Sequence, residues 1–264
     1  MFLYLYTTSR MTTSNHGICK ITVAPVRAEA SDRAEIVTQL LFGDYVEVLS
    51  LDKPWAKIRC QLDGYEGFMD FKQLAYIQSE EYDKGISEKH PVVGNSPWLI
   101  SGPDGIIEVV VGSQLPFLKG DSVELGKDQY TVDRRGRNTH FGPVETGLMF
   151  INVPYLWGGR SIYGIDCSGY TQTIARIHGL EVPRDASKQV RFGEEISFED
   201  RQSGDIPFFI NNNGIVHHVG ILNSPDTILH ASGWIREDVF DEKGIYRKDF
   251  EEYTHQFHSI RRWF

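Results

Sequence analysis

The chain changes character at about residue 146, and this change limits the folds that it can adopt. Before that point, short runs of alternating apolar and polar side chains are separated by Gly, Pro and Asp, with no helical period. Runs of this kind are typical of half-buried strands joined by tight turns. After that point, a helical segment is followed by several further strand-like runs. We therefore predict an α+β fold in which all-β units precede a mixed domain.

Residues 17–77 have the pattern of a small β-barrel. In residues 55–60, Ala, Ile and Cys alternate with Trp, Lys and Arg, which predicts a strand with one buried face. Residues 44–49 are a neighbouring strand, and the Asp-Gly pair at 63–64 predicts a hairpin turn into residues 65–69. Several strands in so short a segment, without a helical period, indicate a barrel.

Residues 78–145 repeat the same layout less clearly. A polar junction opens the segment, and strands are expected at 106–113 and 128–132, again divided by Gly and Pro. We predict a second, divergent barrel of the same kind. Residues 1–16 are an N-terminal extension in this scheme, and Met11 is an alternative start of the protein.

Residues 146–264 combine one clear helix with a run of strands. Asp166 is suited to cap the helix, apolar side chains follow at helical spacing, and Gly179 lies where the helix should end. Strands are expected after the helix, at residues 205–210, 217–222 and 227–231. A helix followed by antiparallel strands indicates an α+β domain.

The charge of the chain argues against two classes of partner. It contains 27 Lys and Arg residues against 36 Asp and Glu residues, a net charge of −9. Nucleic acids and anionic membranes attract clustered positive charge, so neither is an expected partner. No stretch approaches the ~18–20 apolar residues that cross a bilayer, so no membrane insertion is expected.

Cysteine usage bears on the compartment. The chain has three cysteines, Cys19, Cys60 and Cys167. Disulfide-stabilised secreted domains normally have an even and denser set, so a reducing compartment is the simpler interpretation. The apolar start of the chain is too short for a signal-peptide core and has no basic region before it. We expect a cytoplasmic protein, and a periplasmic or secreted location stays open if a leader is missing from this sequence.

Cys167 lies in the first turn of the predicted helix, after a glycine-rich approach. The free N–H groups and the positive dipole end of a helix stabilise a thiolate there and lower the cysteine pKa. A buried structural role is the alternative, and it is the common one for a lone cysteine. For Cys19 and Cys60, which lie in strands with apolar alternation, the structural role is the expected one.

Two histidines are suited to act with such a thiolate, which needs a base and an orienting partner. His218 and His230 are 230 − 218 = 12 residues apart in strand-like runs, a spacing that allows a hairpin and cross-strand neighbours. Adjacent strand residues point to opposite faces, so only one of His217 and His218 can meet the thiolate. Three further histidines are expected at the surface: His178, His255 and His258.

A zinc site is the alternative use of the same side chains. Cys167, His218 and His230 are all residue types that zinc accepts as ligands. A nucleophile at a helix start after a Gly-Gly pair explains more of the sequence, so neither a metal nor another cofactor is expected.

Six sequence blocks between residues 150 and 235 carry a family resemblance. In order they are Tyr155-Leu156-Trp157-Gly158-Gly159, Asp166-Cys167-Ser168-Gly169, Arg184-Asp185-Ala186-Ser187, Ser203-Gly204-Asp205, His218-Val219-Gly220-Ile221 and His230-Ala231. Any one block is weak, whereas six in order are specific. On these blocks the chain resembles the NlpC-type cysteine peptidases, papain-like enzymes that cut the γ-D-glutamyl to diamino acid bond of bacterial wall peptides.

The resemblance implies roles for four catalytic residues. Cys167 is the nucleophile, and His218, which precedes Val-Gly-Ile, is the base. His230 matches the polar residue that orients the base. Tyr155 matches a tyrosine whose hydroxyl lies near the nucleophile and the oxyanion. The implied fold is a papain-like domain preceded by small SH3-like β-barrels.

The amino-terminal half extends the resemblance to a subgroup that degrades free wall peptides in murein recycling. In that subgroup a bacterial SH3-like barrel closes one end of the active site. It restricts the enzyme to murein peptide substrates with a free N-terminal L-alanine, such as L-Ala-γ-D-Glu-diaminopimelate. The resemblance implies that Asp185 binds the ammonium group and that Tyr65 adds a hydroxyl at the same end. Glu29 is the implied second carboxylate, and Ser168 is implied to contact the D-glutamate.

Other functions of the same domains stay open. One is a hydrolase that acts on intact peptidoglycan stems, and another is an acyltransferase or amidase with the same triad. A wall-binding SH3-like protein with a non-catalytic papain-like domain is the alternative among binding proteins. Both diaminopimelate and lysine stay open as the diamino acid, and so does the oligomeric state.

Overall fold

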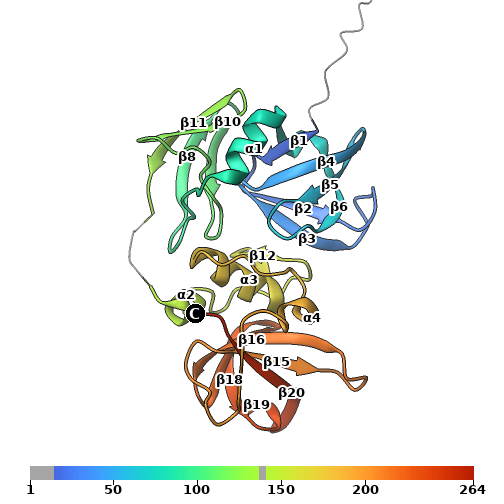
Figure 1. Cartoon of the computed structure of the whole chain (residues 1–264), viewed down its shortest axis with the longest axis vertical. Coiled ribbons are helices and arrows are strands. Elements are labelled where there is room, and N and C mark those ends of the chain that lie inside the picture. Colours follow the sequence, from blue (N-terminus) through green and yellow to red (C-terminus); the bar gives the residue numbers. More distant parts are fainter. Residues whose placement is uncertain (1–14, 137–140) are drawn as a thin grey trace, which may run out of the picture.

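Three units make up the structure, a computed structural model that describes residues 15–136 and 141–264. Two β units lie side by side at one end of the long axis, and the mixed domain lies at the other end (Figure 1). The alternative start at Met11 and most of the N-terminal extension fall in residues 1–14, outside the described residues. Within the described ranges, no helix combines the length and the apolar character that crossing a membrane requires.

The first unit is a seven-stranded antiparallel sheet with the order β3-β2-β6-β5-β4-β1-β7. Its elements are β1 (His16–Cys19), β2 (Val23–Arg27), β3 (Ile36–Leu41), β4 (Tyr45–Asp52), β5 (Trp55–Cys60), β6 (Glu66–Asp70), the 3-10 turn η1 (Phe71–Gln73) and β7 (Leu74–Ile77). As the alternation predicts, β5 buries Ala56, Ile58 and Cys60. Gly64 lies in the turn from β5 to β6 with a φ of 70°, a conformation that favours glycine.

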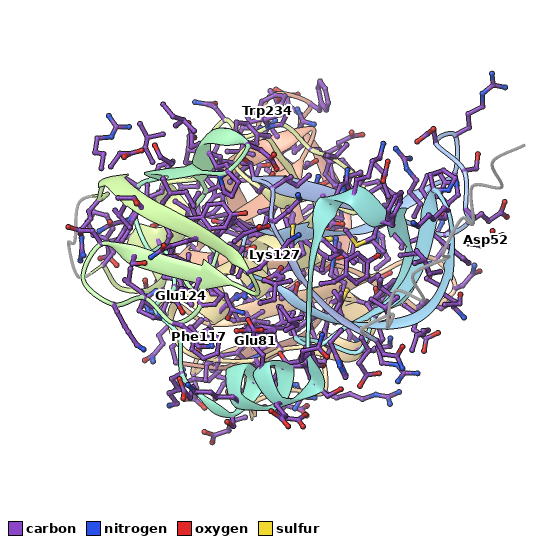
Figure 2. The ribbon with its side chains drawn as sticks, turned by 90° about the horizontal axis from the view of Figure 1, so that it is seen from above. Asp52, Glu81, Phe117, Glu124, Lys127 and Trp234 are labelled. Atoms are coloured by element: carbon purple, nitrogen blue, oxygen red, sulfur yellow. The ribbon has the colours of Figure 1, made fainter. Side chains whose placement is uncertain are left out.

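The second unit consists of a helix and a four-stranded antiparallel sheet with the order β10-β11-β8-β9. Its elements are α1 (Ser79–Ser87), β8 (Trp98–Gly102), β9 (Gly105–Val109), β10 (Ser122–Leu125) and β11 (Asp128–Arg134). Figure 2 shows α1 between this sheet and the strands of the first unit. Glu81 of α1 accepts a hydrogen bond from the N–H of Gly126 at 2.8 Å, which ties the helix to the β10–β11 turn.

The second unit shares one hydrophobic core with the first. Ile18, Phe42 and Tyr45 of the first unit pack in one cluster with Ile100 and Tyr130 of the second. An open four-stranded sheet has an apolar face that must pack on another element. The expected second copy of the first barrel is therefore a smaller sheet that completes the core of its neighbour.

The mixed domain is built on a seven-stranded antiparallel sheet with the order β14-β20-β15-β16-β17-β18-β19. The sheet closes on itself because β19 also pairs with β20. Its strands are β14 (Glu194–Ile196), β15 (Ile206–Ile210), β16 (Val216–Ser224), β17 (Thr227–Ser232), β18 (Trp234–Asp241), β19 (Gly244–Arg247) and β20 (Glu252–Arg262). The other elements are α2 (Pro143–Leu148), β12 (Arg160–Ser161), β13 (Gly164–Ile165), α3 (Cys167–Ile177) and α4 (Ala186–Gln189).

Helix α3 begins at Cys167, where the sequence predicts a helix start. Asp166 Oδ1 caps it by accepting a hydrogen bond from the N–H of Gly169 at 2.7 Å. Gly179, with a φ of 79°, follows the end of the helix. The helix packs on β16 and β17, the strands that carry His218 and His230. This packing places the start of α3 beside the two histidine-bearing strands.

A buried ion cluster joins the first unit to the mixed domain. Asp44 lies 2.6 Å from Arg176 Nη2 and 3.4 Å from Arg160 Nη1, and all three side chains are buried. Arg160 Nη1 also donates to the carbonyl oxygen of Gln39 at 2.9 Å. The first unit is therefore held against the helix that begins at Cys167.

Replacing Asp44 with alanine should lower the free energy of unfolding by about 3–5 kcal/mol, because two buried guanidinium groups lose their partner. Urea unfolding followed by circular dichroism measures this loss. Asp104→Ala is the matched control. Its ion pair with Lys20 is 3.3 Å long and its side chain is 77% exposed, so a loss of about 1 kcal/mol or less is expected. Equal losses in both variants would contradict the importance of the cluster.

Candidate active site

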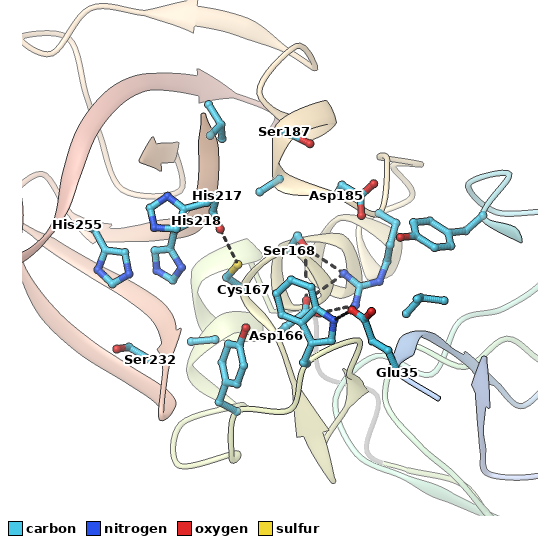
Figure 3. A pocket seen from close by; sticks show the side chains of 18 of the residues that line it. Glu35, Asp166, Cys167, Ser168, Asp185, Ser187, His217, His218, Ser232 and His255 are labelled. Atoms are coloured by element: carbon cyan, nitrogen blue, oxygen red, sulfur yellow. Dashed lines mark hydrogen bonds and ion pairs between the residues drawn. The ribbon is translucent and has the colours of Figure 1, made fainter. Parts of the chain in front are cut away.

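A cavity of about 610 Å³ lies between the first unit and the mixed domain. The first unit contributes Glu35 and Tyr65 to its wall, and the mixed domain contributes Cys167, His218 and Asp185. Figure 3 shows the histidines at one end of the cavity and the carboxylates toward the other, with the thiol between them. The cavity therefore combines a candidate reactive group with two ends of different chemistry.

Cys167 is the first residue of α3 and is 7% exposed, at the wall of the cavity. Its thiol lies 3.9 Å from the carbonyl oxygen of His217, which accepts its hydrogen. Burial raises the pKa of the thiol to about 12, and the charge of Asp166 adds to this rise, while backbone N–H groups and Arg184 oppose it. The sequence-based expectation of a lowered pKa is wrong for this site, because desolvation outweighs the helix end. A base must therefore remove the proton when the thiol reacts.

An ion pair beside Cys167 holds the start of α3. Arg184 Nη2 donates to Asp166 Oδ2 at 2.6 Å and Nη1 donates to Oδ1 at 3.0 Å, and both side chains are buried. Arg184 also donates to Ser168 Oγ at 3.0 Å and to Thr38 Oγ1 of β3 at 3.0 Å. The Ser168 hydroxyl is thus part of this network, and its contact with D-glutamate stays a prediction.

Strand alternation in β16 places His218 in the interior and leaves His217 exposed, as the sequence predicts. His218 is 5% exposed. Burial lowers the pKa of His218 well below its ordinary value, and the neighbouring histidines lower it further. A neutral imidazole has one nitrogen that can accept a proton. At neutral pH the site therefore pairs a protonated thiol with a neutral base.

His218 is the first member of a buried polar chain. Its Nε2 lies 2.8 Å from His230 Nδ1, and His230 Nε2 lies 2.9 Å from Asp238 Oδ2. The two histidines are neighbours on paired strands, as expected, because Gly220 of β16 lies opposite His230 of β17. Asp238 was not predicted from the sequence. The turn at Gly233 is a signal for it, because the strand that follows this turn pairs with β17, and Asp238 lies on that strand.

His255 of β20 belongs to the site, and the prediction that it lies at the surface is wrong. Its ring stacks on that of His218, with centroids 4.0 Å apart and planes 25° apart. Burial lowers the pKa of His255 to about 3. His178 is also partly buried, with Nε2 3.0 Å from Thr146 Oγ1, whereas His258 is exposed as expected. The position of His255 depends on closure of the sheet, which local sequence patterns do not reveal.

Nitrogens of His218, His230 and His255 lie within 4.8 Å of one another, which is close enough for one metal ion to bind all three. A histidine directs its lone pair at a metal in the plane of its own ring. The rings of His218 and His255 are stacked, so their planes do not meet at a shared ion. Both nitrogens of His230 already form hydrogen bonds. The described geometry fits a polar chain better than a metal site.

The opposite end of the cavity carries carboxylates. Asp185, Glu35 and Tyr65 line it, and Asp185 pairs with Lys188 at 3.1 Å. Glu29 is exposed on the first unit and does not belong to the cavity wall. The carboxylate that the first unit brings to the cavity is Glu35. The prediction that Glu29 lies at this end is therefore wrong.

Tyr155 lines the cavity close to Cys167 and is partly exposed. Burial raises the pKa of its hydroxyl to about 12, and the neighbouring Cys167 adds to this rise. The hydroxyl therefore keeps its proton at neutral pH and is available as a hydrogen-bond donor.

Two parts of the chain match known protein families. Residues 152–256 match the NlpC/P60 family, and residues 26–74 match the bacterial dipeptidyl-peptidase Sh3 domain. The first match contains Cys167, His218 and His230. The second contains both residues that the first unit contributes to the charged end of the cavity.

The chain is similar to known proteins over most of its length. This chain is 30% identical to a gamma-D-glutamyl-L-lysine dipeptidyl-peptidase of Bacillus cereus, over 75% of this chain and 67% of that protein. A protein of the same name from Bacillus subtilis is 30% identical over 81% of this chain and 79% of that protein. A crystal structure of an NlpC/P60 family protein from Bacillus cereus has a TM-score of 0.75 at 23% identity, with 94% of this chain and 99% of that chain covered. The predicted fold class is thereby confirmed.

In the folded protein, Cys167 should react with limiting iodoacetamide faster than Cys19 and Cys60. Burial raises the pKa of all three thiols, but Cys167 lines the cavity while the other two lie in the core of the first unit. The rate should rise with pH, because the thiolate is the reactive form. Peptide mapping after brief labelling measures the three rates. Equal labelling of the native thiols would contradict the assignment of Cys167 as the accessible one.

Folding stability should fall as the pH drops from about 6.5 toward 3, in part because of His255. Its pKa is about 3 in the folded protein against 6.5 ordinarily, so the unfolded chain binds the proton first. As the pH falls below 6.5, the free energy of unfolding then decreases by up to about 1.4 kcal/mol per pH unit. His255→Phe keeps a ring beside His218 and should reduce this slope in urea unfolding. His258→Phe, exposed on the same strand, is the control, and equal slopes in both variants would refute the prediction.

Proposed function

The chain belongs to the NlpC/P60 family, and from this premise we propose that it is a cysteine peptidase that hydrolyses the γ-D-glutamyl to L-diamino acid bond of cell-wall peptides. We further propose that its substrates carry a free N-terminal L-alanine. The names of two relatives at 30% identity, both γ-D-glutamyl-L-lysine dipeptidyl-peptidases, support the choice of bond. The observation that carries the proposal is the position of Cys167 between the His218–His230 pair and a carboxylate-lined end of one cavity.

Cys167 is the proposed nucleophile and His218 the proposed base. Neutral His218 takes the thiol proton as Sγ attacks the γ-carbonyl carbon, and the oxyanion accepts hydrogen bonds from the Cys167 N–H and the Tyr155 hydroxyl. Collapse of the tetrahedral intermediate breaks the C–N bond, and His218 gives the proton to the leaving amine. Water then attacks the thioester while His218 accepts its proton, which releases L-alanyl-D-glutamate and restores the thiol.

The charged end of the cavity suits a peptide ammonium group. Asp185 and Glu35 line that end, and the Tyr65 hydroxyl lies at the same wall. A free N-terminal alanine carries the complementary positive charge. Linkage of that alanine to muramic acid removes the charge and adds bulk where the first unit closes the cavity. These features support selection of free peptides over intact wall.

Free wall peptides with this terminus are products of wall turnover, so we propose a role in murein recycling. The cytoplasmic location expected from cysteine usage belongs to the same proposal. The buried chain from His218 to Asp238 disfavours a purely wall-binding role, because buried polar groups are costly and these lie on the strand pair beside a thiol. Hydrolysis of intact stems is the competing function, and acetylated peptides separate the two.

Free L-Ala-γ-D-Glu-diaminopimelate should be cleaved between glutamate and the diamino acid, and its N-acetylated form should be nearly inert. Acetylation removes the ammonium charge and adds bulk where the first unit closes the cavity. Asp185 is 36% exposed and Glu35 is exposed, so the lost charge pair by itself costs about 1 kcal/mol or less, which is about tenfold or less in kcat/KM. Steric exclusion of the acetyl group by the wall of the first unit adds to this loss. Release of diaminopimelate from each peptide measures the difference. Comparable cleavage of both peptides would reject free-amine selection and favour a hydrolase of intact wall.

Variants of single carboxylates locate the ammonium site. Asp185→Asn and Glu35→Gln should both lower kcat/KM on the free peptide and gain little on the acetylated one, because the wall of the first unit remains. Glu29→Gln is the matched control, since this carboxylate is exposed and lies outside the cavity wall. A loss in Glu29→Gln as large as in Glu35→Gln would argue against the assignment of Glu35.

A further inference from the structure

We propose that Asp238, held by Arg236, is a positioning residue that decides which ring nitrogen of His218 carries a hydrogen. In this arrangement Nε2 of His218 bears the hydrogen, and Nδ1 is free to accept the proton of Cys167. The proposal rests on the proposed roles of Cys167 and His218. It adds to them a carboxylate that reaches His218 only through His230.

Strand register brings the polar chain onto one face of the mixed-domain sheet. His230 of β17 lies opposite Gly220 of β16 on one side and opposite Arg236 of β18 on the other. Side chains two residues apart on a strand share a face. His218 therefore lies on the same face as His230, and so does Asp238. The order of contacts along the face follows from the register alone.

Arg236 forms a close ion pair with Asp238. Its Nη2 donates to Asp238 Oδ1 at 2.8 Å, and its Nε lies 2.8 Å from Oδ2. The oxygens of a carboxylate that is ion-paired with a guanidinium group act only as hydrogen-bond acceptors. His230 Nε2, which lies 2.9 Å from Oδ2, must therefore supply the hydrogen of that contact.

The hydrogen positions on both histidines follow from this contact. Burial lowers the pKa values of His218 and His230, so each ring is neutral and has a single N–H. With its hydrogen on Nε2, His230 has an acceptor at Nδ1. The 2.8 Å contact between His230 Nδ1 and His218 Nε2 then places the hydrogen on His218 Nε2. Nδ1 is left as the basic nitrogen of a ring that lines the same cavity as Cys167.

The variant Asp238→Asn should reverse the direction of the hydrogen bonds along the polar chain. Arg236 donates a hydrogen bond to Oδ1, whereas its Nε lies near Oδ2 without forming a hydrogen bond. The amide oxygen therefore takes the Oδ1 position, and the amide N–H₂ faces His230 Nε2. The hydrogen of His230 then moves to Nδ1, where it is donated to His218 Nε2, and the hydrogen of His218 moves to its own Nδ1. The nitrogen that should take the thiol proton is blocked. In a Ser–His–Asp triad the corresponding Asp→Asn change lowers kcat by about 10⁴ for this reason.

The hydrogen positions are measurable without turnover. In protein labelled with nitrogen-15 histidine, long-range proton–nitrogen spectra distinguish a ring nitrogen that bears hydrogen from one that does not. Wild type should have Nε2–H on His218 and on His230, assigned by comparison with His218→Gln and His230→Gln. Asp238→Asn should have Nδ1–H on both. An unchanged pattern in Asp238→Asn overturns the proposal, as does Nδ1–H on His218 in the wild type, which decides the matter even if the variant does not fold.

Kinetics separate positioning from a structural role. On the free tripeptide, Asp238→Asn should lower kcat by about 10²–10⁴, and Asp238→Ala should lose less, because alanine has no group to donate to His230. Asp249→Asn is the matched control, since Asp249 pairs with Arg236 at 3.4 Å and with Arg247 at 2.5 Å, and it should keep the wild-type kcat.

Two kinetic results would overturn the positioning role. One is an unchanged kcat in Asp238→Asn, and the other is an equal loss in the Asn and Ala variants at a wild-type Tm. Failure of the wild type to cleave the tripeptide would instead refute the proposed function. In that case the ring-nitrogen spectra still decide the role of Asp238.

Discussion

The buried ion pair between Asp166 and Arg184 is the contact on which the candidate site depends. Asp166 caps the helix that starts at Cys167 and accepts a hydrogen bond from the N–H of Gly158 at 2.8 Å. Arg184 reaches across to Thr38 of the first unit. Buried charges are tolerated only when they are paired and hydrogen-bonded. The thiol, the glycine-rich loop before it and the first unit therefore take up their positions together.

The cavity lies where two units meet, and its two ends differ in charge. At one end, burial keeps His218 and His255 neutral beside a protonated thiol. At the other end, Glu35 and Asp185 supply negative charge, and Glu35 accepts a hydrogen bond from Trp157 of the mixed domain. Proton transfer is thus confined to a desolvated region, while charge recognition lies next to the first unit. The buried cluster at Asp44 ties the first unit to α3, the helix that begins at Cys167.

Much of the fold was predictable because it follows from interactions between neighbouring residues. Capping by Asp166 predicted where α3 begins, and alternation predicted which face of β5 is buried. The second unit was harder, because its strands resemble those of the first in local pattern. Its four-stranded sheet shares a core with the first unit, and such sharing depends on contacts between distant segments.

By itself, the sequence determined the position of Cys167 at a helix start, the opposite faces of His217 and His218, and the pairing of His218 with His230. Each follows from backbone geometry over a few residues, such as a cap, a strand period or a hairpin. The choice of His218 over His217 came from the family resemblance of the block at His218. Only the tertiary structure decided the rest of the site. Closure of the sheet stacked His255 on His218, and docking of the first unit brought Glu35 to the cavity. Burial at the cavity wall raised the thiol pKa instead of lowering it. Desolvation and proximity between distant segments are properties of the assembled chain, and no local pattern contains them.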